Sequence, residues 1–308
     1  MSSPIANIAE PVHPENIKRE LKHEYLIGPT KKGGNLIYSI TAKDCPEIMK
    51  EIGRLRELAF RSAGGGTGKA LDIDHLDTAN PGYQQLIVYQ PEEEVIIGGY
   101  RYIDCSQFCQ LSQPERRMST THYFNLSDEF VKTYLPYTIE LGRSWVRPDY
   151  QPAANSRKGL YALANLWDGL GALISKNDHL KYFFGKVTMY PDYNREARNL
   201  LLSFMKYFFE DKNGLVSPKY PPPFIYEEEK IQHQFGQLDR RKAISVLRKA
   251  IRGYGESIPP LINLYMGLSP TMRVFGTSIN KDFGDVEETA IMVTIDDIDQ
   301  EKKSRHLP

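Results

Sequence analysis

Two ionisable side chains interrupt an apolar segment, Tyr137 to Val146, whose alternating residues predict a β-strand. They are Glu140 and Arg143, and Ser144 follows directly. Burial disfavours the charged form of a carboxylate, so a glutamate held in a cleft readily accepts a proton from an attacking amine. A plainer alternative is an edge glutamate paired with the arginine. The segment is a candidate catalytic strand, and both interpretations remain open at this point.

A candidate anion-binding segment lies just after this strand. Residues 155–160 read Asn-Ser-Arg-Lys-Gly-Leu and open a predicted helix. The free N–H groups of a helix N-terminus bind phosphate, and the cations Arg157 and Lys158 beside Gly159 would strengthen such a site. Basic residues also begin many exposed helices, so this segment indicates a phosphate site only together with other evidence.

A glycine-rich run, Gly64 to Lys69, has the composition of a nucleotide-binding loop without its pattern. Ala70 stands where a Ser or Thr hydroxyl would hold magnesium, and the run follows a predicted helix rather than a strand. We therefore expect a flexible loop. The acidic residues between 72 and 77 lack the glycine and distal glutamate of a calcium loop, and no GxSxG or HExxH motif occurs. We expect no bound metal.

Composition limits the cellular context. Lys+Arg and Asp+Glu number 39 each in 308 residues, which gives no overall charge that would favour nucleic acid. The three cysteines form no CxxC pair, as expected of reduced thiols. The N-terminus has no signal-peptide core, and the chain has no uncharged apolar run of the ~18 residues that span a bilayer. We expect a cytoplasmic protein, with surface contact at the inner face of the membrane as an option.

The elements that would position these residues alternate between helix and strand, which predicts a mixed α/β sheet with helices on its faces. The predicted strands are 36–40, 86–89, 95–102, 137–146, 182–189, 273–278 and 289–295. The predicted helices are 44–62 with Asp44 as N-cap, 158–175, 194–210 and a basic helix at 238–252.

The chain divides into three predicted parts. Residues 1–34 form an arm, residues 35–296 form one domain, and residues 297–308 form a tail. Residues 212–256 are an insertion in the domain that begins with a proline-rich stretch.

Several ordered segments carry a resemblance to a known family. They are RELAFRSAGGG followed by DIDHLD, then QLIVY followed by EVIIGGYRYI, then ELGRSWVRPDYQ, and finally the run from Ile258 to Asp285. In these segments the chain resembles the lipoamino-acid N-acyltransferases. These are GNAT-type relatives of the acyl-homoserine-lactone synthases and are often labelled hemolysin-like. The resemblance covers residues 36 to 296.

The resemblance implies a GNAT-like sheet in which the parallel strands 137–146 and 182–189 splay to form an acyl-pantetheine slot. It implies transfer of a long acyl or 3-hydroxyacyl chain from acyl carrier protein, or from acyl-CoA, to the α-amine of glycine or ornithine. The amine would attack the thioester directly, with backbone N–H groups stabilising the oxyanion. This is the first step of aminolipid synthesis, and it implies no permanently bound cofactor.

The resemblance also assigns roles to individual residues, with Glu140 as the base that removes the amine proton directly or through a water. The catalytic set is Glu140, Arg143 and Ser144. The residues that hold the acceptor or its loop are Arg56, Phe60, Asp74, Asp77 and Arg101. For Asp74, Asp77 and Arg101, a structural salt-bridge network is the alternative. The residues assigned to acyl-pantetheine are Trp145, Val146, Arg157, Lys158 and Gly159.

The basic helix is a candidate docking surface for acidic acyl carrier protein or anionic lipid headgroups, and a solvated basic face is the alternative. Its cations, opposed by one aspartate, are Arg240, Arg241, Lys242, Arg248, Lys249 and Arg252. The aromatic segments 182–184 and 204–209 are candidates for an acyl tunnel or for core packing.

Two other functions stay open on the sequence. One is an acetyl-CoA-dependent acetyltransferase for a small amine or polyamine, in which the slot would close just beyond the thioester. The other is a non-enzymatic acyl- or membrane-binding protein, which would leave the glutamate of the candidate catalytic strand without a purpose.

Overall fold

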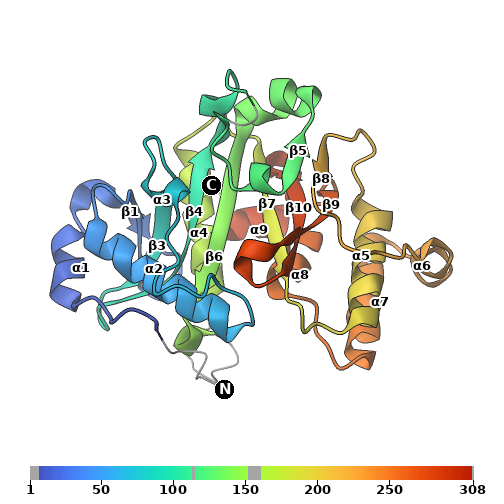
Figure 1. The fold of residues 1–308 in the computed structure, drawn as a ribbon, viewed down its shortest axis with the longest axis horizontal. Helices are drawn as coiled ribbons and strands as arrows, with labels where there is room; N and C mark the ends of the chain where they lie inside the picture. Colours follow the sequence, from blue (N-terminus) through green and yellow to red (C-terminus); the bar gives the residue numbers. More distant parts are fainter. Residues whose placement is uncertain (1–6, 113–114, 152–160, 307–308) are drawn as a thin grey trace.

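The computed structural model describes residues 7–112, 115–151 and 161–306. Eight strands form one sheet in the order β1-β2-β3-β4-β6-β7-β10-β9 (Figure 1). Their bounds are β1 Leu26–Pro29, β2 Leu36–Ile40, β3 Gln84–Gln90, β4 Val95–Asp104, β6 Thr138–Val146, β7 Tyr182–Met189, β9 Arg273–Asn280 and β10 Val286–Thr294. Two further short strands, β5 (Phe124–Leu126) and β8 (Val216–Pro218), pair with each other.

The centre of the sheet contains its one parallel pair of neighbouring strands. β6 runs parallel to β7, whereas the other neighbouring pairs in the sheet run antiparallel. Pairing of β6 with β7 extends only from Thr138↔Tyr182 to Leu141↔Gly185, although both strands continue beyond that point. The predicted mixed α/β sheet with a splayed parallel pair is therefore confirmed.

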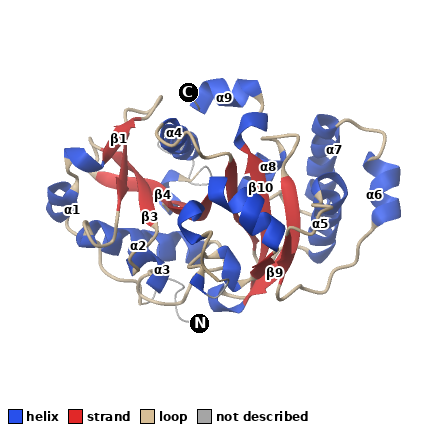
Figure 2. Cartoon of the chain, turned by 90° about the horizontal axis from the view of Figure 1, so that it is seen from above, coloured by secondary structure: helices blue, strands red, loops and turns tan. Residues whose placement is uncertain are grey.

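Helices cover both faces of the sheet. Figure 2 shows α2 and α3 on one side of the β1–β4 half and α4 on the other, with α5 and α7 beside the β9–β10 half. The helix bounds are α1 Pro14–Glu20, α2 Pro46–Ser62, α3 His75–Thr78, α4 Ala162–Ser175, α5 Arg195–Phe209, α6 Glu228–Phe235, α7 Arg240–Gly253, α8 Pro260–Met266 and α9 Gln300–His306.

Alternation along the strands separates the apolar residues into cores on opposite faces. On β7, Phe183 and Val187 join the core beneath α4, α5 and α7, while Phe184 between them joins a core on the opposite face. A third core packs the buried side of α2, including Ile52 and Leu55, against β2, β3 and β4. Because both faces are covered, the central strands are buried on both sides and read as nearly continuous apolar runs.

The start of α2 differs from the prediction. The helix begins at Pro46, and Asp44 does not cap it. Instead, the Glu20 carboxylate at the end of α1 accepts the N–H groups of Glu47 at 3.1 Å and Ile48 at 2.9 Å. These N–H groups have no partner within the helix, so a carboxylate from another segment satisfies them as an N-cap would.

The segment predicted as an arm, residues 1–34, also differs. It contains α1 and the edge strand β1, which pairs with β2 and so belongs to the main sheet. Short strands and helices of this kind give weak sequence patterns, because four residues of strand or seven of helix contain only about two periods. In the proline-rich stretch, Val216–Pro218 forms β8, and α9 occupies most of the predicted tail. The division into an arm, one domain and a tail otherwise stays a prediction.

Candidate active site

A slot opens in the sheet where β6 and β7 separate. After Leu141↔Gly185, the edge of β6 that faces β7 no longer pairs with that strand. On its other edge β6 remains bound to β4, and the N–H of Arg147 donates to the Ile97 carbonyl at 3.1 Å. Successive residues of a strand direct their N–H and C=O groups to opposite sides, so Val146 directs its N–H into the slot. Beyond Leu141, β6 therefore presents to the slot an edge that does not pair with β7, and on this edge the Gln151 side chain donates to the Val146 carbonyl at 2.8 Å.

A β-bulge deforms β6 beside the slot. The register with β4 shifts between Gly99↔Trp145 and Arg101↔Gly142, so that Arg143 and Ser144 both lie opposite Tyr100. Arg143 has a φ of 48°, in the left-handed region that residues with a Cβ rarely adopt. Bulges of this kind redirect side chains next to active sites. Here the bulge brings both Arg143 and Ser144 to a cavity wall.

A cavity of about 540 Å³ passes through the sheet at the slot. Alternating side chains of β7 belong to opposite faces of the sheet, yet Phe183, Phe184, Lys186 and Val187 all line this cavity. The volume lies within the range of about 300–1,000 Å³ typical of small-molecule sites. A ligand in the slot therefore reaches both faces of the sheet.

One part of the cavity is a deep apolar arm between α4, α8, β7 and β10. It is lined by Leu163, Leu166, Trp167, Leu170, Phe183, Leu261, Tyr265, Ile291 and Val293. Tyr100 also lines the cavity; burial raises the pKa of its phenol well above the usual value, and its hydroxyl has no hydrogen-bond partner among the described residues. The arm thus presents apolar walls with one unsatisfied hydroxyl.

The other part is the charged end of the cavity, formed by Arg143, Lys186 and Glu288. Among the described residues that line the cavity, these three are the ones with charged side chains. Lys186 Nζ lies 2.7 Å from Glu288 Oε2, and both side chains are nearly buried. Burial lowers the pKa of Lys186, and Glu288 opposes that shift. The charged end therefore has two cations and one anion.

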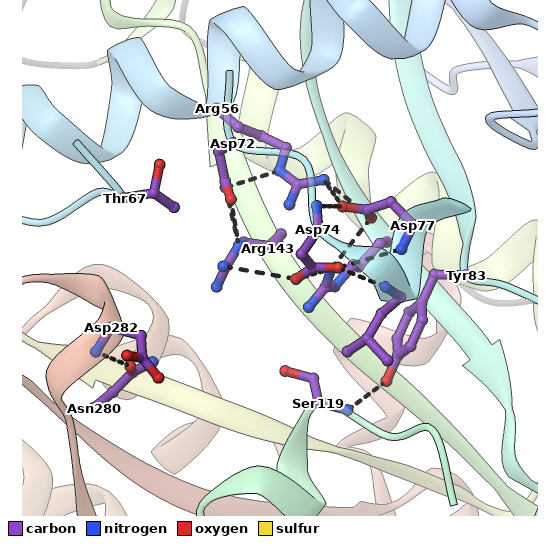
Figure 3. A network of polar contacts seen from close by, with 12 residues as sticks. Arg56, Thr67, Asp72, Asp74, Asp77, Tyr83, Ser119, Arg143, Asn280 and Asp282 are labelled. Carbon is purple, nitrogen blue, oxygen red and sulfur yellow. Dashed lines mark hydrogen bonds and ion pairs between the residues drawn. The ribbon is translucent and has the colours of Figure 1, made fainter. Parts of the chain in front are cut away.

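A network of three arginines and three aspartates lies behind the charged end (Figure 3). Arg56 reaches Asp72 at 3.0 Å and Asp77 at 3.2 Å, and Arg101 reaches Asp77 at 3.2 Å. Burial alone would raise the pKa of Asp77, but Arg56 and Arg101 hold it below the usual value. Asp74 caps α3 and accepts from Arg101 Nη1 at 2.9 Å.

Arg143 connects this network to the cavity. Its Nε lies 2.9 Å from Asp72, and its guanidinium carbon lies 4.3 Å from the centre of the Phe283 ring. Phe283 lines the cavity and meets Phe60 edge to face at 5.2 Å between ring centres. Of the residues predicted to hold the acceptor, Phe60 thus lies on the cavity wall. The charged members Arg56, Asp74, Asp77 and Arg101 are joined in salt bridges, the alternative that the sequence left open for the last three.

Glu140 is buried but is not among the residues that line the cavity. Its carboxylate accepts the hydroxyls of Tyr83 and Thr120, and also the Thr120 N–H at 2.7 Å. Tyr83 in turn accepts the N–H of Ser119 at 2.8 Å, and Ser119 lines the cavity. The structure therefore brings Arg143 and Ser144 to the cavity wall, whereas the Glu140 carboxylate is hydrogen-bonded to Tyr83 and Thr120 behind that wall.

The glycine-rich run folds around a carboxylate of the protein itself. Glu57 of α2 accepts the N–H of Thr67 at 3.0 Å, the Thr67 hydroxyl at 2.8 Å and the Gly68 N–H at 2.8 Å. Gly66 has a φ of 99°, a backbone conformation that glycine adopts without strain. These N–H groups are therefore occupied by an internal anion. In the described chain, no group of His, Cys, Asp and Glu side chains is arranged to hold a metal ion.

The predicted docking helix is α7, and it packs beside the apolar arm. Arg248 donates to Asn263 of α8 at 2.8 Å, and α8 contributes Leu261 and Tyr265 to the arm. Arg240 differs from the prediction, because it points inward and donates to the Met266 carbonyl at 3.1 Å. The remaining predicted cations of α7 are exposed, namely Arg241, Lys242, Arg248, Lys249 and Arg252.

The other predicted residues divide between the cavity and the core. Trp145 and Val146 line the cavity, as do Phe183 and Phe184 of the first aromatic segment. The second aromatic segment, 204–209, is not among the lining residues, and its Phe204 packs against Phe235. Arg157, Lys158 and Gly159 lie outside the described residues. No helix within the described ranges is both long and apolar enough to cross a membrane.

Lys186, Glu288 and Tyr100 were missed by the sequence reasoning. Lys186 is the one charged residue within the predicted strand 182–189. It interrupts an apolar strand in the same way as Glu140 interrupts strand 137–146. Glu288 stands just before a predicted strand that begins at 289, so the pattern placed it outside the sheet. Nothing in the local sequence distinguishes Tyr100 from the other aromatic residues of its hairpin.

A mixed sheet in which two central parallel strands separate beside a cavity is the arrangement that the resemblance to GNAT-type acyltransferases implied. The sequence profile of the family described as "Acetyltransferase (GNAT) domain" matches residues 55–158 of this chain. The match covers the second half of α2, the β3–β4 hairpin and β6, which lie on one side of the slot.

Two curated relatives are similar to nearly the whole chain. The glycine N(alpha)-acyltransferase of Phocaeicola vulgatus is 48% identical over 302 residues, covering 97% of this chain and 92% of the relative. The protein of the same name from Bacteroides thetaiotaomicron is 49% identical over 302 residues, covering 97% of this chain and 89% of the relative. No solved structure matches the chain. The chain therefore belongs to the family of these glycine N(alpha)-acyltransferases, and it is an N-acyltransferase.

Proposed function

We propose that this enzyme transfers a long acyl chain from a pantetheine thioester to the α-amine of glycine, as the first step of aminolipid synthesis. The observation that carries the proposal is the cavity, which joins an apolar arm to a charged end through the gap between β6 and β7. A donor with an apolar chain fits one part, and a zwitterionic acceptor fits the other. The names of the two relatives support glycine as the acceptor.

The charged end favours glycine over ornithine and over a polyamine. A zwitterion carries one ammonium and one carboxylate, which the described charges Arg143, Lys186 and Glu288 can complement. Ornithine has a second ammonium and a polyamine has several. Each further buried cation needs an anionic partner, and Glu288 is the one carboxylate among the described lining residues.

The apolar arm favours a long donor chain over acetyl. Its walls come from α4, β7, β10 and α8, so the cavity continues well beyond the slot. Burial of each methylene contributes about 0.8 kcal/mol, and a long chain therefore gains affinity that an acetyl group cannot. The Tyr100 hydroxyl, without a partner among the described residues, would bond a hydroxyl on the chain and so favours a 3-hydroxyacyl donor.

The reaction would proceed by direct attack within the slot. The pantetheine amides would pair with the edge of β6 that faces the slot near Trp145 and Val146, where they would displace the Gln151 side chain from the Val146 carbonyl. Arg143 and Ser144 would then lie close to the thioester. The amine nitrogen bonds to the carbonyl carbon, an N–H group of β6 stabilises the oxyanion, and the C–S bond then breaks. The thiolate leaves as a thiol after it takes a proton. Glu140 would act by holding the 118–122 segment at the cavity wall.

We also propose acyl carrier protein as the donor. The exposed cations of α7 lie beside α8, which closes the apolar arm, so an acidic carrier could dock close to the cavity. Coenzyme A is the alternative carrier of the same pantetheine thioester.

The decisive test is to incubate the purified enzyme with 3-hydroxypalmitoyl carrier protein, palmitoyl carrier protein and acetyl-CoA, each with glycine, ornithine or spermidine. We expect N-acylglycine by mass spectrometry, formed fastest from the hydroxylated long-chain donor. Leu166→Trp, which fills the apolar arm, should lower kcat/KM for the long donor at least tenfold and spare shorter chains. Turnover of acetyl-CoA alone would instead support a small-amine acetyltransferase.

A further inference from the structure

Lys186 and Glu288 occupy the point at which the slot opens. Gly185 is the last residue of β7 that pairs with β6, so Lys186 is the first residue beyond the pairing. On the neighbouring strand β10, Ala290 lies opposite Lys186 and Glu288 lies opposite Thr188. Lys186 and Glu288 are therefore diagonal neighbours on one face of the sheet, where their side chains meet.

The surroundings of this pair leave it directed at the cavity. Lys186 Nζ lies 2.7 Å from Glu288 Oε2, 3.4 Å from the Ser119 carbonyl and 4.4 Å from the centre of the Tyr123 ring. The exposed fractions of the two side chains are 8% and 5%. Both residues line the cavity, as does Ser119. The ammonium thus meets one carboxylate, one carbonyl and one aromatic face. The charges of Glu140 and Arg143 also act on it, with opposite effects on its pKa, and it lines the cavity.

Stability alone does not account for a charge pair at this position. The desolvation of two buried ions offsets most of their attraction, and a well-packed apolar pair is often as stable. Here the pair stands at the wall of an otherwise largely apolar cavity, and Lys186 is the first residue of β7 beyond its pairing with β6. The position suits groups that bind and deprotonate an amino acid.

Arg143 is less suited to bind the acceptor carboxylate. Its Nε is already 2.9 Å from Asp72, and its guanidinium is stacked on Phe283. These contacts fix its orientation and neutralise part of its charge. Lys186, by contrast, has its partner Glu288 inside the cavity, where an incoming zwitterion can exchange with it.

We infer that Lys186 and Glu288 form the acceptor site, where Lys186 binds the α-carboxylate and Glu288 removes a proton from the α-ammonium. This inference rests on the proposed function. Glu288 takes one proton from the ammonium, which frees the nitrogen lone pair to form the C–N bond. When the C–S bond breaks, the second proton goes from nitrogen to the thiolate. Glu288 then releases its proton to solvent, so atoms and charge balance.

The variants that test the inference are Lys186→Met, Lys186→Arg, Glu288→Gln and Glu140→Gln, assayed with long-chain carrier protein and varied glycine. Lys186→Met should raise the KM for glycine at least tenfold. Lys186→Arg keeps the positive charge, so its KM for glycine should stay close to that of the wild type. Glu288→Gln should lower kcat at least about 100-fold, the usual minimum contribution of a general base. That loss should shrink at high pH, where free amine is supplied by solution.

A second substrate separates binding from a structural defect. Glycinamide lacks the carboxylate, so the wild-type enzyme should prefer glycine strongly and Lys186→Met should lose that preference. Trp145 and Trp167, the two tryptophans of the chain, both line the cavity, so their fluorescence reports donor binding in every variant. The exposed ion pair Lys206–Glu210 supplies matched controls, Lys206→Met and Glu210→Gln, which should match the wild type.

Two outcomes would overturn the inference. One is an unchanged preference for glycine over glycinamide in Lys186→Met. The other is a normal kcat in Glu288→Gln together with a large loss in Glu140→Gln, which would make Glu140 the base. Failure of the proposed function has a different signature, because the wild-type enzyme itself would then form no N-acylglycine. The same variants assayed with the amino acid that it does accept would still decide the inference.

Discussion

Two groups of buried charges lie within one molecule and differ in what surrounds them. In the network of Arg56, Asp72, Asp77 and Arg101, the charges are enclosed by protein and neutralise one another. The side chains of the pair Lys186–Glu288 are nearly as buried, at 8% and 5% exposed, but they line the cavity. Arg143 belongs to both groups, since it reaches Asp72 and also lines the cavity.

This difference separates a structural role from a functional one more clearly than burial does. A closed network has no position for a ligand, so its charges can only fix the backbone elements that carry them. Here those elements are α2, α3 with the residues just before it, and β4, which pairs with the bulged strand β6. A pair on a cavity wall has one side available for exchange with a ligand.

The largest expected effect breaks the closed network. Arg56→Met leaves Asp72 and Asp77 buried without their shared cation, and removal of one partner from a buried pair costs about 3–5 kcal/mol. Lys186→Met should cost less, because Glu288 faces a cavity that water can enter. Urea denaturation would give both free energies of unfolding. Equal losses in the two variants would erase the distinction between the closed network and the cavity pair.

The second-largest expected effect is a loss of folding stability in acid, caused by protonation of the aspartates in the network. Burial alone would raise the pKa values of Asp72 and Asp77, but their arginine partners hold both below the usual value. Near pH 3–4 the unfolded chain therefore binds more protons than the folded chain, and stability falls as pH falls. A single aspartate of this kind contributes about 2–3 kcal/mol that is lost in acid.

The measurement is the free energy of unfolding between pH 7 and pH 3, compared between the wild type and Asp77→Asn. The variant should begin less stable and lose less stability on acidification, since it lacks one of the linked carboxylates. A parallel decline in the two proteins would show that Asp77 does not carry the acid sensitivity.

The smallest expected effect concerns the exposed charges of α7. Reversal of charge in Arg241→Glu with Arg248→Glu should raise the KM for acyl carrier protein several-fold and leave the KM for glycine unchanged. Exposed charges are screened by salt, so the difference should fade at high ionic strength. An unchanged KM for the carrier protein at low salt would remove α7 from the docking surface. Lys206→Glu on α5 is the control for a change of surface charge elsewhere.

Local pattern predicted most of the elements that build the slot. Strands 137–146 and 182–189 appear as β6 and β7 within one residue at each end, and helix 194–210 appears as α5 within one residue. These segments are long enough to contain several periods of apolar alternation. The family resemblance supplied the parallel, splayed arrangement of β6 and β7, which no periodicity contains.

The sequence did not predict which charged residues line the cavity. Glu140 and Lys186 both lie within apolar strands, and the pattern makes them equally good candidates for a catalytic residue. Side chains alternate between the two faces of the sheet. When a strand is buried on both faces, it has no polar side, so its sequence does not show which residues face the cavity. The bulge at Arg143 adds a residue to β6 and alters the alternation between Glu140 and Ser144.

By itself, then, the sequence determined the class of fold, the main strands and helices, and the family, since these rest on periodic burial and on ordered local motifs. Only the tertiary structure decided that Glu140 holds a loop while Lys186 meets Glu288 in the cavity. That meeting depends on the register of β10 against β7, two strands that are distant along the chain. Register is fixed by the packing of whole faces, so no local segment encodes it.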